Sequence, residues 1–354
     1  MVVYYILVII PGIISLFYYL NKSGKTKTIT FFLFFSFLWI LLSLRSYEVG
    51  VDIKNYKYIF ETVRATPWDS LFNLSLESGY VLFNKVIGTF TDNFSVFLAI
   101  TSFIIIYPLY LLYKKESTDP LLTFVLFINM PNFVMIFSGL RQALAISLSI
   151  IAFYSAKKKN FLRFILVTLL AVLFHRSAVI VLLLYPIYHS KITKKWLLFA
   201  IPSLLAAFIF NKQLFLFFIR LLGSSYYEKY AEIQSTNAYT MIILFALFLA
   251  FSFFMVNDND LDANTLGLRN IMLLIFAIQL FAPINTMAMR MNYYFLVYIP
   301  VLISNTILYS KEKLFLLAKT ARKIMILFFV IYFFYNAYTG ADILQVFPYR
   351  FYWE

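Results

Sequence analysis

Long apolar runs follow one another along almost the whole chain, and they limit what it can fold into. Hydrophobic residues fill 62% of the 354 positions and charged residues only 13%. A helix of roughly 20 apolar residues crosses a bilayer with all its backbone groups bonded. The apolar segments are 2–20, 28–44, 94–113, 120–137, 139–156, 161–175, 177–189, 195–211, 239–256, 267–284, 292–310 and 323–339. We therefore expect an all-α integral membrane protein, a polytopic helical bundle of about 12 transmembrane segments.

Several of these segments are irregular. The segments 161–175 and 177–189 are short for a full crossing, so they form either one broken element or a tight hairpin. Pro131 and Pro283 predict kinks, because proline lacks the backbone N–H that continues a helix. The first run, 2–20, has no basic residues before it and no small-residue cleavage site, so it is interpreted as a span rather than a signal peptide.

The basic residues indicate an orientation. Membrane proteins gather Lys and Arg in cytoplasmic loops, so the net charge of +14 does not indicate a nucleic-acid binder. With the N-terminus outside, dense lysine groups such as 114–115 and 157–159 fall inside. Both termini then lie outside. The prediction is one transmembrane domain, 1–354, with long extracytoplasmic loops at 45–93 and 211–239.

Long loops in compact proteins often act as lids or binding elements. The first loop contains a semi-apolar stretch, 80–90, that is expected near the membrane interface. The second contains an aromatic cluster made of Tyr226, Tyr227 and Tyr230. The chain has no cysteine, which excludes disulfides and thiolate metal sites.

Four arginines interrupt or follow the apolar runs, and this topology places all four at the outer face. They are Arg45, Arg141, Arg176 and Arg290. A charge within a span costs at least a few kcal/mol, so it usually marks a site, a pathway or a partner. Asp52 and His175 fall on the same side. Charged groups that are scattered along the sequence are thus expected to converge on one side of the membrane.

The stretch from Arg45 to Tyr56 reads RSYEVGVDIKNY. Gly50 permits a tight or left-handed backbone. In a functional interpretation Arg45 holds an anion and Asp52 acts as a base. In the simpler interpretation the two form an ion pair that caps the outer end of the second segment.

Three further positions are candidates for chemistry. Arg141 follows Ser138-Gly139 one turn into a helix, where its guanidinium and the free N–H groups suit a phosphate or diphosphate. Alternatively, it only extends to the interface. His175 is either a general base or sugar-hydroxyl partner, or a helix cap. Arg290, followed by aromatic residues, fits a carbohydrate or lipid-phosphate site or an ordinary interfacial belt.

Cofactor-binding motifs are missing from the sequence. There is no metal-ligand cluster and no glycine-rich nucleotide loop, and Asp258-Asn259-Asp260 lies on the expected inner side. Transport driven by nucleotides and transfer from nucleotide sugars are both disfavoured, and no cofactor is expected.

Three motifs together carry a family resemblance. Arg45 to Phe60, Gly139 to Ala145 (GLRQALA) and Phe174 to Ala178 (FHRSA) occur in this order over roughly residues 40–190. In this order and spacing they resemble the EpsG branch of the Wzy-type polymerases of O-antigen, capsule and exopolysaccharide.

The resemblance implies a metal-independent glycosyltransferase in the bacterial inner membrane, with its active site on the periplasmic face. Such an enzyme transfers a growing glycan from one undecaprenyl diphosphate to the terminal sugar of another lipid-linked repeat. Its partners would be that lipid substrate, the bilayer, and possible chain-length regulators and flippases of the same pathway. The candidate catalytic residues are Asp52 and His175. The candidate diphosphate- or sugar-binding residues are Arg45, Tyr56, Arg141, Gln142, Arg176 and Arg290.

Three other functions stay open. An O-antigen-ligase-like transferase would need a second type of acceptor. A flippase or transporter of lipid-linked oligosaccharides would line a central cavity with its charges, whereas these charges are expected at one face. A structural or assembly protein would use the arginines only to anchor helix ends.

Overall fold

The computed structural model describes residues 2–192, 194–221, 237–283, 286–339 and 344–354. Helices make up 81% of the structure, and the described residues contain no strand. Residue contacts divide the chain into two compact units, Met1–Leu182 with Ala321–Glu354, and Leu183–Thr320. A single domain over 1–354 stays a prediction.

The first unit is built on five helices that pack in succession: α2 against α1 and α5, α5 against α8, and α8 against α9. Its helices are α1 (Val2–Leu20), α2 (Gly24–Leu44), α3 (Ile53–Ala65), η1 (Trp68–Asn73), α4 (Ser78–Phe90), α5 (Phe94–Glu116), α6 (Pro120–Asn129), α7 (Pro131–Ser138), α8 (Leu140–Lys157), α9 (Phe161–Val172) and most of η2 (Arg176–Leu183) and α17 (Phe315–Thr339). Aromatic side chains fill its core, as where the ring of Phe34 on α2 stacks on Phe124 of α6 with centroids 3.9 Å apart.

The second unit is centred on α14, which contacts α10, α13, α15 and α16. Its helices are α10 (Leu184–His189), η3 (Lys194–Trp196), α11 (Leu197–Ile209), α12 (Asn211–Leu221), α13 (Asn237–Met255), η5 (Asp258–Asp260), α14 (Ala263–Gln279), α15 (Thr286–Leu296), α16 (Ile299–Leu308) and η6 (Glu312–Leu314). Gly267 lets α10 approach closely, because a Cβ there would lie 2.4 Å from the ring of Tyr188.

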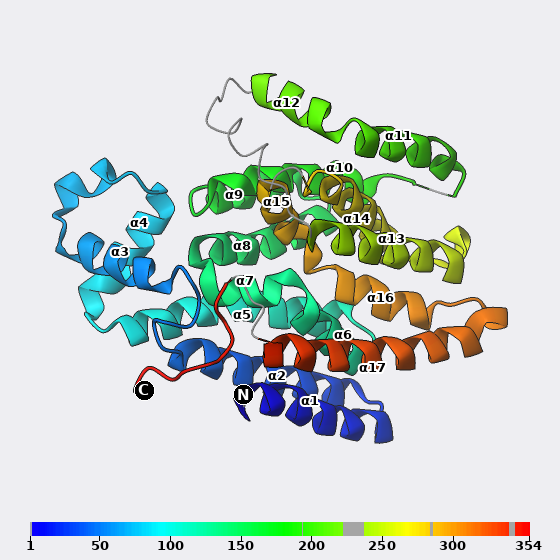
Figure 1. The fold of residues 1–354 in the computed structure, drawn as a ribbon, viewed down its shortest axis with the longest axis horizontal. Helices are drawn as coiled ribbons and strands as arrows, with labels where there is room; N and C mark the ends of the chain where they lie inside the picture. The colour runs from blue at the N-terminus through cyan, green and yellow to red at the C-terminus, as the bar shows by residue number, and fades with distance from the viewer. Residues whose placement is uncertain (1, 193, 222–236, 284–285, 340–343) are drawn as a thin grey trace. The chain divides into compact units, whose positions relative to one another are not determined.

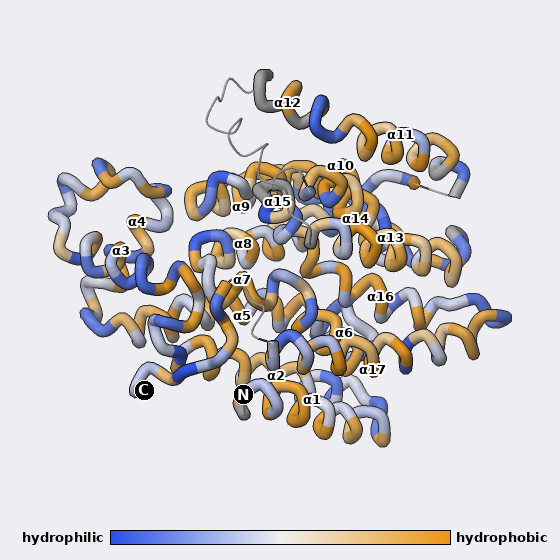
Figure 2. The backbone as a smooth tube through the Cα atoms, viewed as in Figure 1, coloured by the Kyte–Doolittle hydropathy of each residue, from blue (hydrophilic) through white to orange (hydrophobic). Residues whose placement is uncertain are grey.

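Each of the twelve predicted apolar segments falls on a helix or on a pair of helices, and hydrophobic residues run along most of them (Figure 2). Among the described residues, four helices qualify as membrane spans by length and composition, or up to six if each bent pair is one span. The helical membrane architecture is therefore confirmed, whereas a count of twelve crossings stays a prediction.

The kink predicted at Pro131 is confirmed, since α6 and α7 meet there at 63°. The kink predicted at Pro283 is wrong. Helix α14 already ends at Gln279, and Pro283 lies in the turn that follows.

The region 45–93, expected as a long loop, is mostly helical. It contains α3, η1 and α4, which lie beyond the end of α2 and α5 (Figure 1, left). Helix α3 is amphipathic, because Ile53, Tyr56, Phe60 and Val63 recur at helical spacing and are buried. The tyrosine cluster predicted in the second loop, at 226–230, lies outside the described residues.

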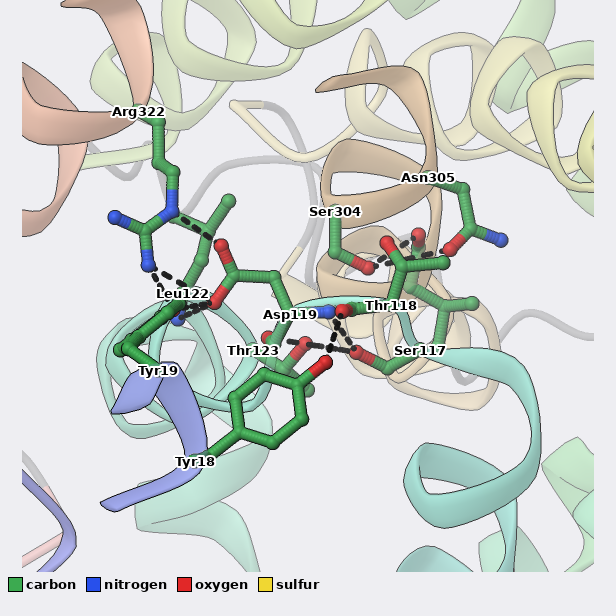
Figure 3. Close-up of polar contacts among 11 residues, drawn as sticks. Tyr18, Tyr19, Ser117, Thr118, Asp119, Leu122, Thr123, Ser304, Asn305 and Arg322 are labelled. Carbon is green, nitrogen blue, oxygen red and sulfur yellow. Dashed lines mark hydrogen bonds and ion pairs between the residues drawn. The ribbon is translucent and has the colours of Figure 1, made fainter. Parts of the chain in front are cut away.

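Polar contacts hold the two ends of the first unit. At one end Arg322 of α17 and Tyr19 of α1 both bond to Asp119, the residue that caps α6 (Figure 3). At the other end the last residues of the chain pack on the turn after α2, where the amide of Gly50 donates to the carbonyl of Gln345 at 3.0 Å. Tyr4 of α1 bonds to Val346 at that same end, so both chain ends lie there, as the predicted topology requires.

Candidate functional site

One carboxylate, Glu77, contacts two of the predicted site residues. Its Oε2 lies 2.6 Å from Nη1 of Arg141, and its Oε1 lies 3.4 Å from Nδ1 of His175. The Glu77 side chain is only 10% exposed, against 28% for Arg141 and 25% for His175. The carboxylate is thus more deeply buried than the two partners, and both of them reach the surface.

Arg141 owes its position to the break between α7 and α8. Helix α7 ends at Ser138, and α8 begins at Leu140, so Arg141 is the second residue of a new helix. A hydrogen bond also links Arg141 to the phenol of Tyr56, which is 5% exposed on α3. Arg141 is therefore held from two sides, and the predicted candidate Tyr56 belongs to its surroundings.

Glu77 and His175 meet because Gly79 has no side chain. The amide of Gly79 donates to the carbonyl of Leu173 at 2.9 Å. A Cβ on Gly79 would lie 2.8 Å from that carbonyl oxygen, closer than side chains tolerate. The start of α4, which follows Glu77, can thus dock on the backbone just before His175.

The charge of this cluster is fixed by its contacts. Burial alone would raise the pKa of Glu77, but the close contact with His175 and the charge of Arg141 outweigh it and lower the pKa to about 2. Glu77 is therefore ionised across the physiological range, and it holds a permanent negative charge between a cation and an imidazole.

Asp52 lies beside this cluster rather than in it. It flanks the start of α3 and is exposed, and its Oδ2 accepts a hydrogen bond from Ser138 at 3.2 Å. Gly50, just before it, has a φ of +101°, and a Cβ there would lie 2.3 Å from the carbonyl of Phe137. The predicted left-handed glycine is confirmed, and it brings Asp52 against the end of α7.

The alternative of an Arg45–Asp52 ion pair is wrong. Arg45 is 1% exposed, and its guanidinium bonds to the carbonyl of Leu42 and lies 5.8 Å from the ring centre of Phe137. Asp52 is instead bound by Ser138, because the turn at Gly50 directs it toward α7. Arg45 therefore cannot be assigned the role of positioning Asp52.

The other candidates have separate environments. Arg176 begins η2 directly after His175 and is exposed, without a hydrogen-bond or ion-pair partner among the described residues. Gln142 is 6% exposed next to Arg141. Arg290 is exposed on α15 in the second unit. The structure thus groups Arg141 and His175 with Tyr56, while the convergence of Arg290 with them stays a prediction.

Comparison with known families agrees with the motifs brought together here. The sequence profile of the EpsG family matches residues 28–351. The chain belongs to the EpsG family. Searches of curated proteins and of solved structures found no significant match. Membership indicates a membrane protein of the polysaccharide-polymerase type, with glycosyltransferase-like chemistry. The match extends through the C-terminal third, beyond the part in which the sequence motifs had been recognised.

Sequence reasoning missed Glu77 in this EpsG family member. The chain carries 16 acidic residues against 30 basic ones, so an acidic residue in an expected outer region is in itself a signal of a partner for the arginines. It also missed Tyr349 and Tyr352, which the C-terminal segment places near Arg45: Tyr349 bonds to Leu41, and the amide of Tyr352 bonds to Leu44. No local pattern links these residues to Arg45.

Proposed function

We propose that the chain polymerises undecaprenyl-diphosphate-linked oligosaccharide repeats at the outer leaflet of the bacterial inner membrane. It would transfer the growing glycan onto the terminal sugar of another lipid-linked repeat and release the lipid diphosphate. The observation that carries the proposal is the Glu77 carboxylate in contact with both Arg141 and His175. This arrangement supplies a base and a cation at one surface, which glycosyl transfer from a diphosphate needs.

His175 is the proposed general base. The acceptor hydroxyl oxygen forms a bond to the anomeric carbon of the donor glycan, and its proton passes to the imidazole. Glu77 acts as a positioning residue, since an adjacent carboxylate orients the ring and stabilises the imidazolium that forms. The sequence left the choice between Asp52 and His175 open. The Glu77 contact favours His175, and the bond to Ser138 gives Asp52 a positioning role at the break before α8.

The arginines are assigned to the leaving group. When the anomeric carbon–oxygen bond breaks, its electron pair stays on the lipid diphosphate, and a guanidinium can neutralise that charge without a metal. Arg141 commits Nη1 to Glu77, while its buried Nε has no hydrogen-bond partner in the described part of the chain. Arg176 is exposed and has no partner there either. Gln142, Tyr56 and Arg290 are proposed as further diphosphate- or sugar-binding groups.

Purified protein in proteoliposomes, given one lipid-linked repeat and excess EDTA, tests the proposal. A ladder of longer glycans is expected, because one substrate serves as donor and acceptor and no metal takes part. Arg141→Ala should abolish the ladder, whereas Arg163→Ala, an exposed arginine on α9, should leave it intact. A requirement for a second acceptor type would favour a ligase. A full ladder from Arg141→Ala would refute the assignment of the site.

A further inference from the structure

Two open cavities of about 330 Å³ each share Tyr47 as a wall, at the same end of the first unit as the Glu77 cluster. The first lies between the end of α2, helix α3 and the start of α5, and its lining includes Arg45, Glu61, Asp92 and Tyr352. The second lies between the turn after α2 and the C-terminal segment. The two cavities together are called the Tyr47 groove. Each lies at the lower end of the volumes typical of small-ligand pockets.

A buried arginine underlies the first cavity. Arg45 is 1% exposed, and of its guanidinium only Nη1 makes a hydrogen bond, to the carbonyl of Leu42. Its Nε and Nη2 have no acceptor among the described residues. Donors left without an acceptor in a buried position are costly, and these N–H groups place uncompensated positive charge behind the cavity wall, which attracts the oxygen atoms of a ligand.

The charges around the cavity cancel. The cations of Arg45 and Lys57 face the carboxylates of Glu61 and Asp92, and Lys57 lies 3.9 Å from Glu61. Asp92 is exposed and has no ion-pair partner in the described ranges. A diphosphate with at least two negative charges would gain little net attraction here. A neutral ligand rich in hydroxyl groups would find both donors and acceptors.

Aromatic rings complete the cavity. Tyr47 is 45% exposed and Tyr352 is 53% exposed, so both present ring surface at the rim. The face of an aromatic ring carries partial negative charge and attracts the weakly positive C–H groups of an apolar ligand face. A sugar ring offers both such a C–H face and a rim of hydroxyl groups.

We propose that the Tyr47 groove binds sugar residues of the glycan substrate, apart from the cluster that handles the diphosphate. This inference rests on the proposed function and names where that substrate's glycan lies. Helix α3 connects the two sites: Lys57 lines the groove, and the preceding residue, Tyr56, bonds to Arg141. A glycan held in the groove therefore stays beside the reacting centre between successive additions.

Saturation-transfer NMR tests binding without any reaction. The probes are the methyl glycosides of glucose, galactose, mannose, rhamnose and N-acetylglucosamine at millimolar concentration, with the full-length protein in nanodiscs. At least one should give a transfer signal that falls several-fold in Tyr47→Ala and is retained in Tyr47→Phe. Tyr58→Ala, which removes a tyrosine that is 68% exposed on α3 but does not line the groove, should leave the signal unchanged. Inorganic diphosphate should not displace the glycoside.

Two results would overturn the inference: no glycoside signal that depends on Tyr47, or displacement of the glycoside by diphosphate. Where wild-type protein forms a ladder, Tyr47→Ala should shorten its longest products while the first addition continues. Glycoside binding without any ladder would refute the proposed polymerase activity and still support sugar binding in the Tyr47 groove. A ladder without Tyr47-dependent binding would support the polymerase activity and refute sugar binding in the groove.

Discussion

The ion pair between Arg141 and Glu77 should behave as one energetic unit. The perturbation is a double-mutant cycle with Arg141→Met, Glu77→Gln and the combined variant. Arg141→Met leaves a carboxylate that is only 10% exposed without its cation, whereas Glu77→Gln removes the charge and nearly preserves the shape. Breaking a buried pair from one side is costly because the remaining charge stays desolvated.

The expected coupling free energy between Arg141 and Glu77 follows from the distance between their charges and from the pKa of Glu77. Two unit charges about 4 Å apart at an effective dielectric of about 20 attract by about 4 kcal/mol. The fall in the pKa of Glu77 to about 2, to which His175 contributes more than Arg141, corresponds to about 3 kcal/mol in favour of its ionised form. Arg141 is 28% exposed, so solvent screening reduces the expected coupling to about 2 kcal/mol.

Unfolding by SDS titration in mixed micelles measures the three variants against the wild type. Arg141→Met should lower the free energy of unfolding by about 2–3 kcal/mol, and the double variant should lose no more than that. Losses that add within about 0.5 kcal/mol would show that the two side chains do not interact, and would refute the reasoning.

Two further predictions concern the same cluster. Because the pKa of Glu77 is lowered, its stabilising contribution is present above the ordinary carboxyl pKa of 4.5 and is lost as the pH falls toward about 2. The stability difference between wild type and Glu77→Gln should thus shrink below about pH 4.5 in thermal melts, and a difference that shrinks between pH 8 and 6 would contradict this. Gly79→Ala should cost about 1–3 kcal/mol and at least tenfold in ladder formation, because its Cβ would press on Leu173 and move Glu77 from His175. Gly24→Ala, where a Cβ meets nothing within 4 Å, should change neither quantity, and equal behaviour of the two variants would contradict the docking role of Gly79.

Local patterns predicted a large part of this structure. Apolar segments located the helices because a hydrophobic stretch in a membrane must hydrogen-bond its own backbone N–H and C=O groups, and a helix does so within one segment. Successive apolar segments cross the membrane in alternate directions, which placed Arg141 and His175 on the same side of the membrane. The structure brings both residues to Glu77. Gly50 was recognisable because a left-handed turn favours a residue without a side chain.

The missed features depend on contacts between distant parts of the chain. Glu77 joins the site only because the start of α4 docks on Leu173, nearly a hundred residues later. One of the two interpretations of Arg45 paired it with Asp52, whereas residues at the C-terminal end of the chain enclose it. Sequence spacing carries little information about such pairings.

The rate of ladder growth as a function of pH tests the central claim most directly, and the chain offers its own control because it contains only two histidines, His175 and His189. Wild type and His189→Gln should show the same rate at every pH. His175→Gln should be slower by about 100-fold or more, within the usual contribution of a general base, and should lose the pH dependence of the wild-type rate. A His175→Gln protein with the wild-type rate and pH profile would contradict the account.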